Sequence, residues 1–240
     1  MRSANFAILL TVVAFIEGCS EVGGAADAAL NDTPPTTTVA LYDRSISVPA
    51  EDRSLYVSSL KALGVGMRGG DRLLLAPIGD QTRSNFRPSL DLPVISTDVR
   101  LDQEDAEAEA RKTIESLAES LLAAGNDAGH TRILEAIGAA SEAFKAGQPG
   151  RRRLILLTDG VEESDVVNLD QPEVTSDEIK DAMAKAKTLD LLPNLRGVDL
   201  IVIGAGGEDY AGVRAFWIAY AKETGAKLIG YGRLPLQPAA

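Results

Sequence analysis

The chain has 240 residues, of which 45% are hydrophobic and 25% charged, and its formal net charge is −11. This balance is typical of a globular protein with enough apolar side chain for a sizeable core, in one large domain or two small ones. The negative charge argues against binding to nucleic acid, whose phosphates would be repelled, and against attraction to anionic membrane surfaces.

Residues 1–18 are predicted to be a signal peptide. Arg2 precedes an apolar run over residues 6–16, which is short for a bilayer span of about 20 residues and suits a signal-peptide core. The run ends in Ile16-Glu17-Gly18-Cys19, which resembles the lipobox of bacterial lipoproteins. That resemblance implies cleavage before Cys19 and lipidation of its sulfur. The alternative is an ordinary secretory cleavage site with an incidental cysteine nearby.

The segment that follows is predicted to be a tether. Cys19 is the only cysteine, so the chain forms no intrachain disulfide. Residues 19–35 are rich in Gly, Ala, Asp and Pro and show no apolar period, as expected of a flexible linker that holds a domain near a membrane. By the lipoprotein resemblance, Ser20 implies outer-membrane sorting. We therefore expect an exported, lipid-anchored protein of the bacterial cell envelope, with a folded domain over residues 36–232 and a loose tail over 233–240.

Strands and helices are predicted to alternate from residue 36 onward. Mainly apolar runs are typical of strands buried in a parallel sheet, and these fall at 39–42, 71–78, 154–157, 198–203 and 227–231. The proline-containing run 86–95 suits an edge strand or an extended connection. Helical periodicity and capping signals indicate helices at 55–63, 103–124, 131–144, 175–191 and 213–220, the fourth opened by a capping box of Thr175 and Glu178. The alternation predicts an α/β fold with a mostly parallel sheet and helices on both faces.

Oxygen-bearing side chains stand where these strands end and where one helix begins. Asp43, Ser45 and Ser47 follow the first strand, Thr131 opens a helix, and Asp159 ends the strand at 154–157. In sheets of this kind, sites form outside the carboxyl ends of the strands. Two carboxylates and three hydroxyls suit a hard cation such as Mg²⁺. We therefore predict a magnesium site built from these five residues.

The three motifs together resemble a von Willebrand factor A domain with a metal-ion-dependent adhesion site. The matching patterns are D-x-S-x-S at 43–47, G-x-T-x-I-x-x-A-I at 129–137 and T-D-G at 158–160, in the family's order. The resemblance covers roughly residues 36–231 and implies a doubly wound, six-stranded sheet of order 3-2-1-4-5-6. It also implies that Mn²⁺ or Ca²⁺ can substitute for Mg²⁺, and that an open coordination position accepts a carboxylate from a partner protein.

The expected function is a Mg²⁺-dependent protein-binding module for adhesion or assembly in the cell envelope, and not an enzyme. Two alternatives stay open: a metal-dependent hydrolase, and an architectural protein in which the metal only stabilises the fold. Nucleotide binding is not expected, because the glycine pattern at 64–69 follows a helix and precedes a strand, the reverse of the dinucleotide-binding order.

Two acidic groups near the predicted site have more than one interpretation. Glu51 and Asp52 lie close to the position of a second acidic pair in some family members, where they would hold an accessory cation, but their spacing differs by one residue. Glu162, Glu163 and Asp165 follow Asp159 and form either an acidic rim of the site or a solvated loop.

Overall fold

The computed structural model describes residues 34–46, 48–79, 83–84, 86–124, 127–145, 150–171, 173–206, 211–233 and 235–236. They belong to one compact unit, Pro34–Ala240. The predicted signal peptide, Cys19 and Ser47 lie outside the described residues. The elements follow in the order β1 (Thr36–Asp43), α2 (Ala50–Gly66), β2 (Arg72–Ile78), β3 (Leu90–Pro93), α3 (Arg100–Ala124), α4 (Ile133–Ala140), α5 (Glu142–Lys145), β4 (Arg151–Thr158), α6 (Ser176–Thr188), β5 (Val198–Gly204), α7 (Ala211–Thr224) and β6 (Lys227–Gly232).

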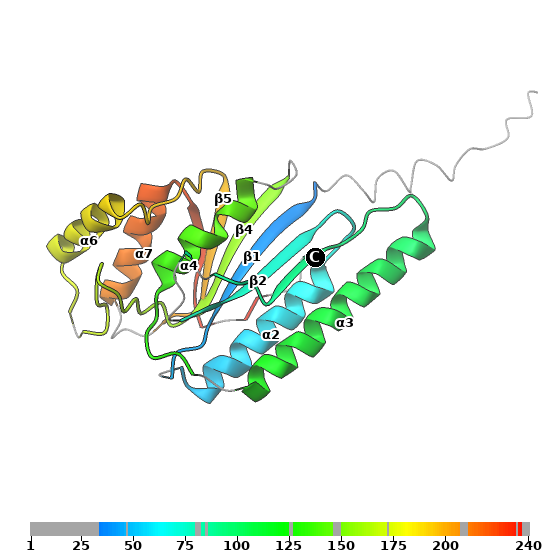
Figure 1. Cartoon of the computed structure of the whole chain (residues 1–240), viewed down its shortest axis with the longest axis horizontal. Helices are drawn as coiled ribbons and strands as arrows, with labels where there is room; N and C mark the ends of the chain where they lie inside the picture. The colour runs from blue at the N-terminus through cyan, green and yellow to red at the C-terminus, as the bar shows by residue number, and fades with distance from the viewer. Residues whose placement is uncertain are drawn as a thin grey trace, which may run out of the picture. The chain divides into compact units, whose positions relative to one another are not determined.

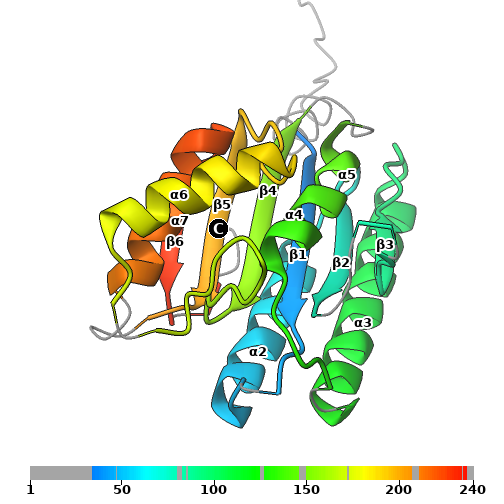
Figure 2. The same ribbon diagram turned by 60° about the vertical axis from the view of Figure 1, so that its left-hand side comes forward.

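The strands form one six-stranded sheet in the order β3-β2-β1-β4-β5-β6, visible from edge to edge in Figure 2. Neighbouring strands run parallel except β3, which pairs antiparallel with β2. Its place at the edge fits the presence of Pro93, which has no N–H to donate to a neighbouring strand. The predicted fold class and strand order are confirmed.

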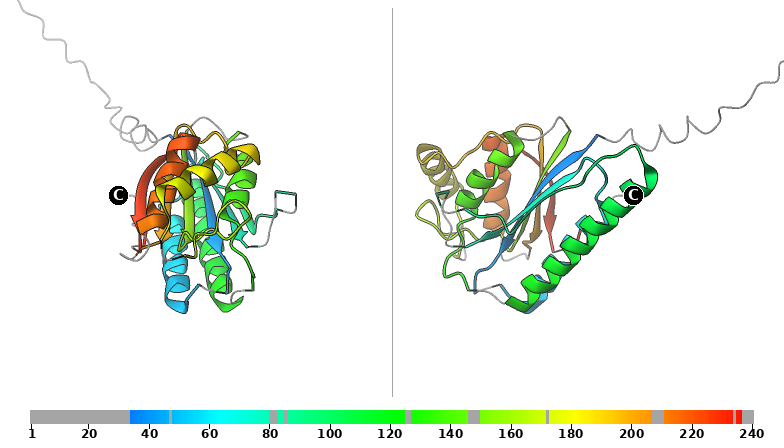
Figure 3. Two further views of the ribbon diagram at one scale, coloured as in Figure 1. Left: turned by 90° about the vertical axis from the view of Figure 1, so that its left-hand side faces the viewer. Right: turned by 45° about the vertical axis from the view of Figure 1, so that its right-hand side comes forward.

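Helices cover both faces of the sheet (Figures 1 and 3). Helices α2 and α3 lie side by side on one face, and α4, α6 and α7 lie on the other. Successive residues of β1 alternate between the two cores: Ala40 and Tyr42 pack with α2 and α3, whereas Val39 and Leu41 pack with the opposite helices. Because both faces are buried, the middle of each central strand is apolar, which made these strands recognisable in the sequence.

Local signals in two helices are confirmed. The Thr175 hydroxyl accepts a hydrogen bond from the Glu178 backbone N–H, and the Glu178 carboxylate accepts one from the Thr175 N–H, so the capping box of α6 is complete. On α7, Phe216, Trp217 and Tyr220 are buried and their rings contact one another. Among the helices in the described ranges, none has the length and apolarity needed to cross a membrane.

Candidate metal site

The first part of the site lies at the carboxyl end of β1. Asp43 ends the strand and is only 2% exposed, and Ser45 is 3% exposed. The Asp43 carboxylate accepts hydrogen bonds from the Ser45 backbone N–H at 2.8 Å and from the Thr158 hydroxyl at 2.7 Å. The first bond is the short-range turn contact that favours Asp at such positions. The second ties the end of β1 to the end of β4, its neighbour in the sheet.

The loop before α4 carries Thr131 to the same edge of the sheet. The Ala128 carbonyl accepts a hydrogen bond from the Ile46 N–H at 3.2 Å, so this loop runs beside the continuation of β1. The Thr131 carbonyl accepts a hydrogen bond from the Glu163 N–H at 2.9 Å, in the loop after β4. The next residue donates its N–H to the Gly79 carbonyl, just beyond β2. Thr131 is therefore held between the ends of β2 and β4, where β1 ends, and it is 3% exposed.

The T-D-G motif at the end of β4 forms the third part. The hydroxyl of Thr158, which is fully buried, contacts Asp159 Oδ1 at 3.4 Å besides its bond to Asp43. Asp159 Oδ1 also accepts the Val161 N–H at 2.9 Å. Gly160 has φ +83°, and a Cβ there would lie 2.9 Å from Trp217 Nε1, which donates to the Gly160 carbonyl. The sharp turn that positions Asp159 thus requires glycine next in the chain.

The negative charge of each carboxylate is disfavoured by its surroundings, and the pKa of each is raised. Burial raises the pKa of Asp43, with hydrogen bonds from Ser45 and Thr158 acting against it. Burial also raises the pKa of Asp159 to about 6, and the negative charge of Asp43 adds to the rise. Neither carboxylate forms an ion pair with a basic side chain among the described residues. Buried charges are usually paired or coordinate a metal, and an added cation would compensate both carboxylates.

The donor set fits such a cation only if hydroxyls take part. In the part of the chain that the structure describes, no group of three or more His, Cys, Asp or Glu side chains is placed to hold a metal. Asp43, Ser45, Thr131 and Asp159 come from three loops at one edge of the sheet and offer two carboxylates and two hydroxyls. Oxygen donors with few carboxylates and remaining positions for water suit Mg²⁺. Ser47, the fifth predicted ligand, is outside the described residues, and the roles of all five stay predictions.

The acidic pair at the start of α2 is engaged by an arginine from the other end of the chain. Arg233, directly after β6, contacts the carboxylates of Asp52 and Glu51. The Asp52 side chain is 7% exposed, so the guanidinium compensates a buried charge. Further along this tail, the Leu236 N–H donates to the Ser59 hydroxyl on α2. Arg233 therefore occupies the place that an accessory cation would need.

Sequence reasoning missed two residues that organise the site. The sequence analysis gave Thr158 no role, yet its hydroxyl donates to Asp43 at 2.7 Å and lies 3.4 Å from Asp159 Oδ1. Glu162 was assigned either to an acidic rim or to a solvated loop, and it belongs to neither because it is fully buried. Its carboxylate accepts the N–H groups of Ile133 and Leu134 at 2.6 and 3.0 Å, and burial raises its pKa to about 7.

Glu162 therefore acts as the N-terminal cap of α4. The residue at the N-cap position, Arg132, offers no side-chain acceptor. The orphan N–H groups at the start of a helix need an acceptor, and here it comes from a different loop. The sequence did hold a signal for a distant cap: no Ser, Thr, Asp or Asn stands directly before the helix. Thr131 lies one position before the N-cap residue. The bond also fixes the loop of Thr131 to the loop of Asp159.

No family model matches the sequence, and a search of curated proteins finds no match. Among solved structures, the PilB minor pilin from Streptococcus sanguinis superposes with a TM-score of 0.51 at 12% identity, covering 84% of this chain and 58% of the pilin. The chain thus spans less than two thirds of the pilin's length, and at this identity the likeness is one of fold.

Two other solved structures are similar with lower scores. A von Willebrand factor type A protein from Catenulispora acidiphila has a TM-score of 0.41 at 16% identity, covering 80% of this chain and 43% of that one. The manganese-loaded TRAP protein of Plasmodium vivax has a TM-score of 0.42 at 16% identity, covering 81% and 75%. The chain has a doubly wound α/β fold, with the sheet order that the sequence resemblance implies.

Proposed function

We propose that this chain is a von Willebrand factor A domain that binds Mg²⁺ and, through it, a carboxylate of a partner protein. The observation that carries the proposal is the pair of carboxylates of buried Asp43 and half-buried Asp159, which lie on either side of Thr158 and lack a basic partner among the described residues. Two negative charges in a desolvated place favour a divalent cation, which relieves both at once.

The residues available would leave part of the metal's coordination shell to water or to a ligand. Asp43, Ser45, Thr131 and Asp159 are the described candidates, and Ser47 is the further candidate from the sequence. Mg²⁺ prefers six oxygen ligands and usually keeps several waters. When bound, the ion supplies a positive centre that an external carboxylate can approach in an otherwise acidic protein of net charge −11. A protein partner that presents Asp or Glu is the ligand that this chemistry favours.

The proposed place of action is the bacterial cell envelope. Its support comes from the sequence: the apolar run at 6–16, the lipobox-like residues before Cys19, and a tether of Gly, Ala, Asp and Pro. A flexible linker of about 15 residues reaches roughly 20 Å, enough to hold a binding domain just off a membrane surface.

Metal binding is tested by thermal unfolding of the purified full-length protein with Mg²⁺, Mn²⁺, Ca²⁺ or EDTA. A ligand at 100 times its Kd stabilises by about 2.7 kcal/mol, which for a chain of this size raises Tm by roughly 5–10 °C. The double variant Asp43→Ala, Asp159→Ala should lose that shift. The matched control Glu109→Ala, Asp181→Ala removes the same charge from exposed helix positions and should keep it. No shift in the wild-type protein at millimolar metal would overturn the proposed site.

Carboxylate recognition is tested with a displayed library of random peptides selected on the immobilised, Mg²⁺-loaded protein. Selected peptides should be enriched in Asp and Glu, and EDTA should release them. Enrichment that is independent of metal would contradict a metal-mediated contact. The same preparation should not turn over generic phosphoesters or carboxylic esters; metal-dependent turnover abolished by the double variant would instead favour the hydrolase alternative.

A further inference from the structure

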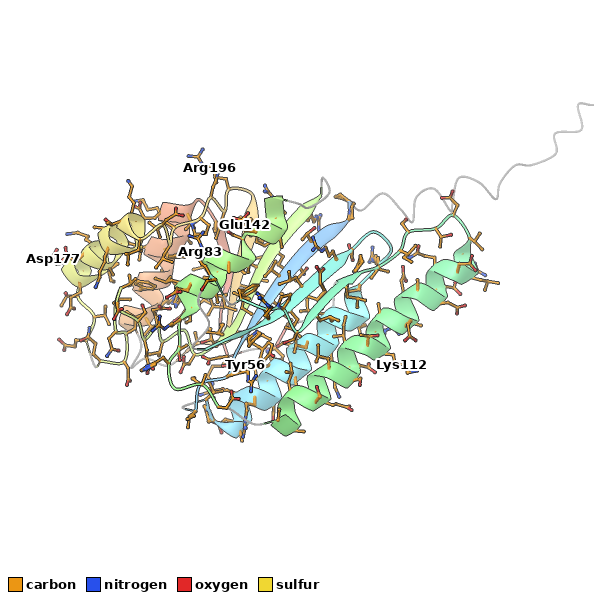
Figure 4. All side chains as sticks on the ribbon, viewed as in Figure 1. Tyr56, Arg83, Lys112, Glu142, Asp177 and Arg196 are labelled. Atoms are coloured by element: carbon orange, nitrogen blue, oxygen red, sulfur yellow. The ribbon has the colours of Figure 1, made fainter. Side chains whose placement is uncertain are left out.

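Tyr56 of α2 lies deep between that helix and the sheet, on the side of the carboxyl ends of the strands. It is 4% exposed and packs in the same core as Tyr42 and Leu157. Figure 4, where Tyr56 is labelled, shows it on the α2 side of the sheet. Gly204 ends β5, and a Cβ there would lie 2.8 Å from both the Tyr56 hydroxyl oxygen and the Thr158 carbonyl oxygen. The hydroxyl is therefore placed beside the ends of β4 and β5.

The Tyr56 hydroxyl has no hydrogen-bond partner among the described residues, although the atom is buried. A buried tyrosine usually pairs its hydroxyl, because an unpaired buried polar group destabilises the fold. A phenylalanine at this position would fill the same space without that cost. The hydroxyl thus reduces the stability of the metal-free protein, and no contact of the hydroxyl among the described residues compensates for this loss.

The surroundings of the hydroxyl are those of the candidate metal site. Its burial and the negative charges of Asp43, Asp159 and Asp52 raise the pKa of Tyr56 far above the ordinary value, so the hydroxyl keeps its proton. The Thr158 side chain contacts both site carboxylates. Its carbonyl oxygen lies beside Gly204, as the Tyr56 hydroxyl does. A protonated hydroxyl close to acceptors of negative charge is a donor of strong hydrogen bonds.

We infer that Tyr56 is a positioning residue of the candidate metal site, whose hydroxyl donates a hydrogen bond to a water that the site's carboxylates hold. This inference rests on the proposed function, since the role requires that the site bind a metal ion. Outer partners of metal ligands fix the orientation of the ligands, and their loss typically lowers metal affinity 10–100-fold. The Tyr56 hydroxyl therefore lowers the stability of the metal-free fold and raises the affinity of the site for the ion.

Tyr56→Phe in the purified full-length protein tests the inference, with Mg²⁺ and Mn²⁺ affinities measured by titration calorimetry and Tm measured in EDTA. The expected result has two opposite parts. In EDTA, Tm stays the same or rises, because an unpaired hydroxyl has been removed. The Kd for the metal rises about tenfold.

Tyr220→Phe is the matched control, because the Tyr220 hydroxyl is equally buried but donates to the Leu191 carbonyl. It should lower Tm in EDTA and leave the metal Kd unchanged. If wild-type protein and Tyr56→Phe bind metal with equal Kd, the role of Tyr56 is wrong while the metal site stands. If the wild-type protein binds neither ion, the proposed function fails and the inference fails with it.

Discussion

Asp159→Asn is predicted to stabilise the metal-free protein at neutral pH while abolishing its response to metal. In the folded protein the pKa of Asp159 is raised from 3.8, the ordinary value, to about 6, chiefly by burial and further by the charge of Asp43. Such a carboxyl binds protons more tightly in the folded state than in the unfolded chain. Its contribution to stability is therefore fully present below about pH 4 and is lost as the pH rises through about 6.

The size of the effect follows from that pKa. A rise of about two pKa units corresponds to roughly 3 kcal/mol, and partial exposure of the side chain reduces this to about 2 kcal/mol. Asparagine carries no charge, and its Oδ1 can still accept the Val161 N–H that Asp159 accepts at 2.9 Å. In a domain of this size, 2 kcal/mol corresponds to roughly 4–8 °C in Tm.

The assay is thermal unfolding of both proteins by circular dichroism in EDTA, at several values between pH 4 and 7.5. The variant should exceed the wild type by about 4–8 °C at pH 7.5, and the difference should vanish near pH 4, where both side chains are neutral. Millimolar Mg²⁺ should reverse the order at pH 7.5. The reasoning is refuted if the variant is no more stable in EDTA at pH 7.5, or if its advantage is the same at pH 4.

Three further predictions concern contacts around the site, each measured by urea unfolding in EDTA at pH 7.5. Arg233→Ala leaves the buried Asp52 carboxylate without its guanidinium and should cost about 1–3 kcal/mol, whereas Arg233→Lys should retain part of the stability. Glu162→Ala leaves two buried N–H groups of α4 without an acceptor and should cost about 2–3 kcal/mol; an equal loss from Glu163→Ala would contradict the capping role. Thr175→Ala removes the cap of α6 and should cost about 1 kcal/mol; no change would show that the capping box contributes nothing.

The order and type of the alternating elements were predictable because the signals for them are local. The central strands are buried on both faces and are therefore apolar in their middle parts. The capping box of Thr175 and Glu178 involves residues three apart, within the reach of one helical turn. The edge position of β3 followed from its proline. The candidate ligands were found in the same way, since each stands directly where a strand ends or a helix begins.

The sequence by itself determined the fold class, the mostly parallel character of the sheet and the oxygen donors available at its carboxyl edge. Only the tertiary structure decided how these groups are joined and what charge they carry. Thr158 bonds Asp43 across 115 residues, and Arg233 reaches Asp52 across 181. Local propensity acts over about one helical turn and holds no information about such pairs. Burial of Tyr56 and Glu162, and the raised pKa of Asp159, arise only when packing removes water from around them.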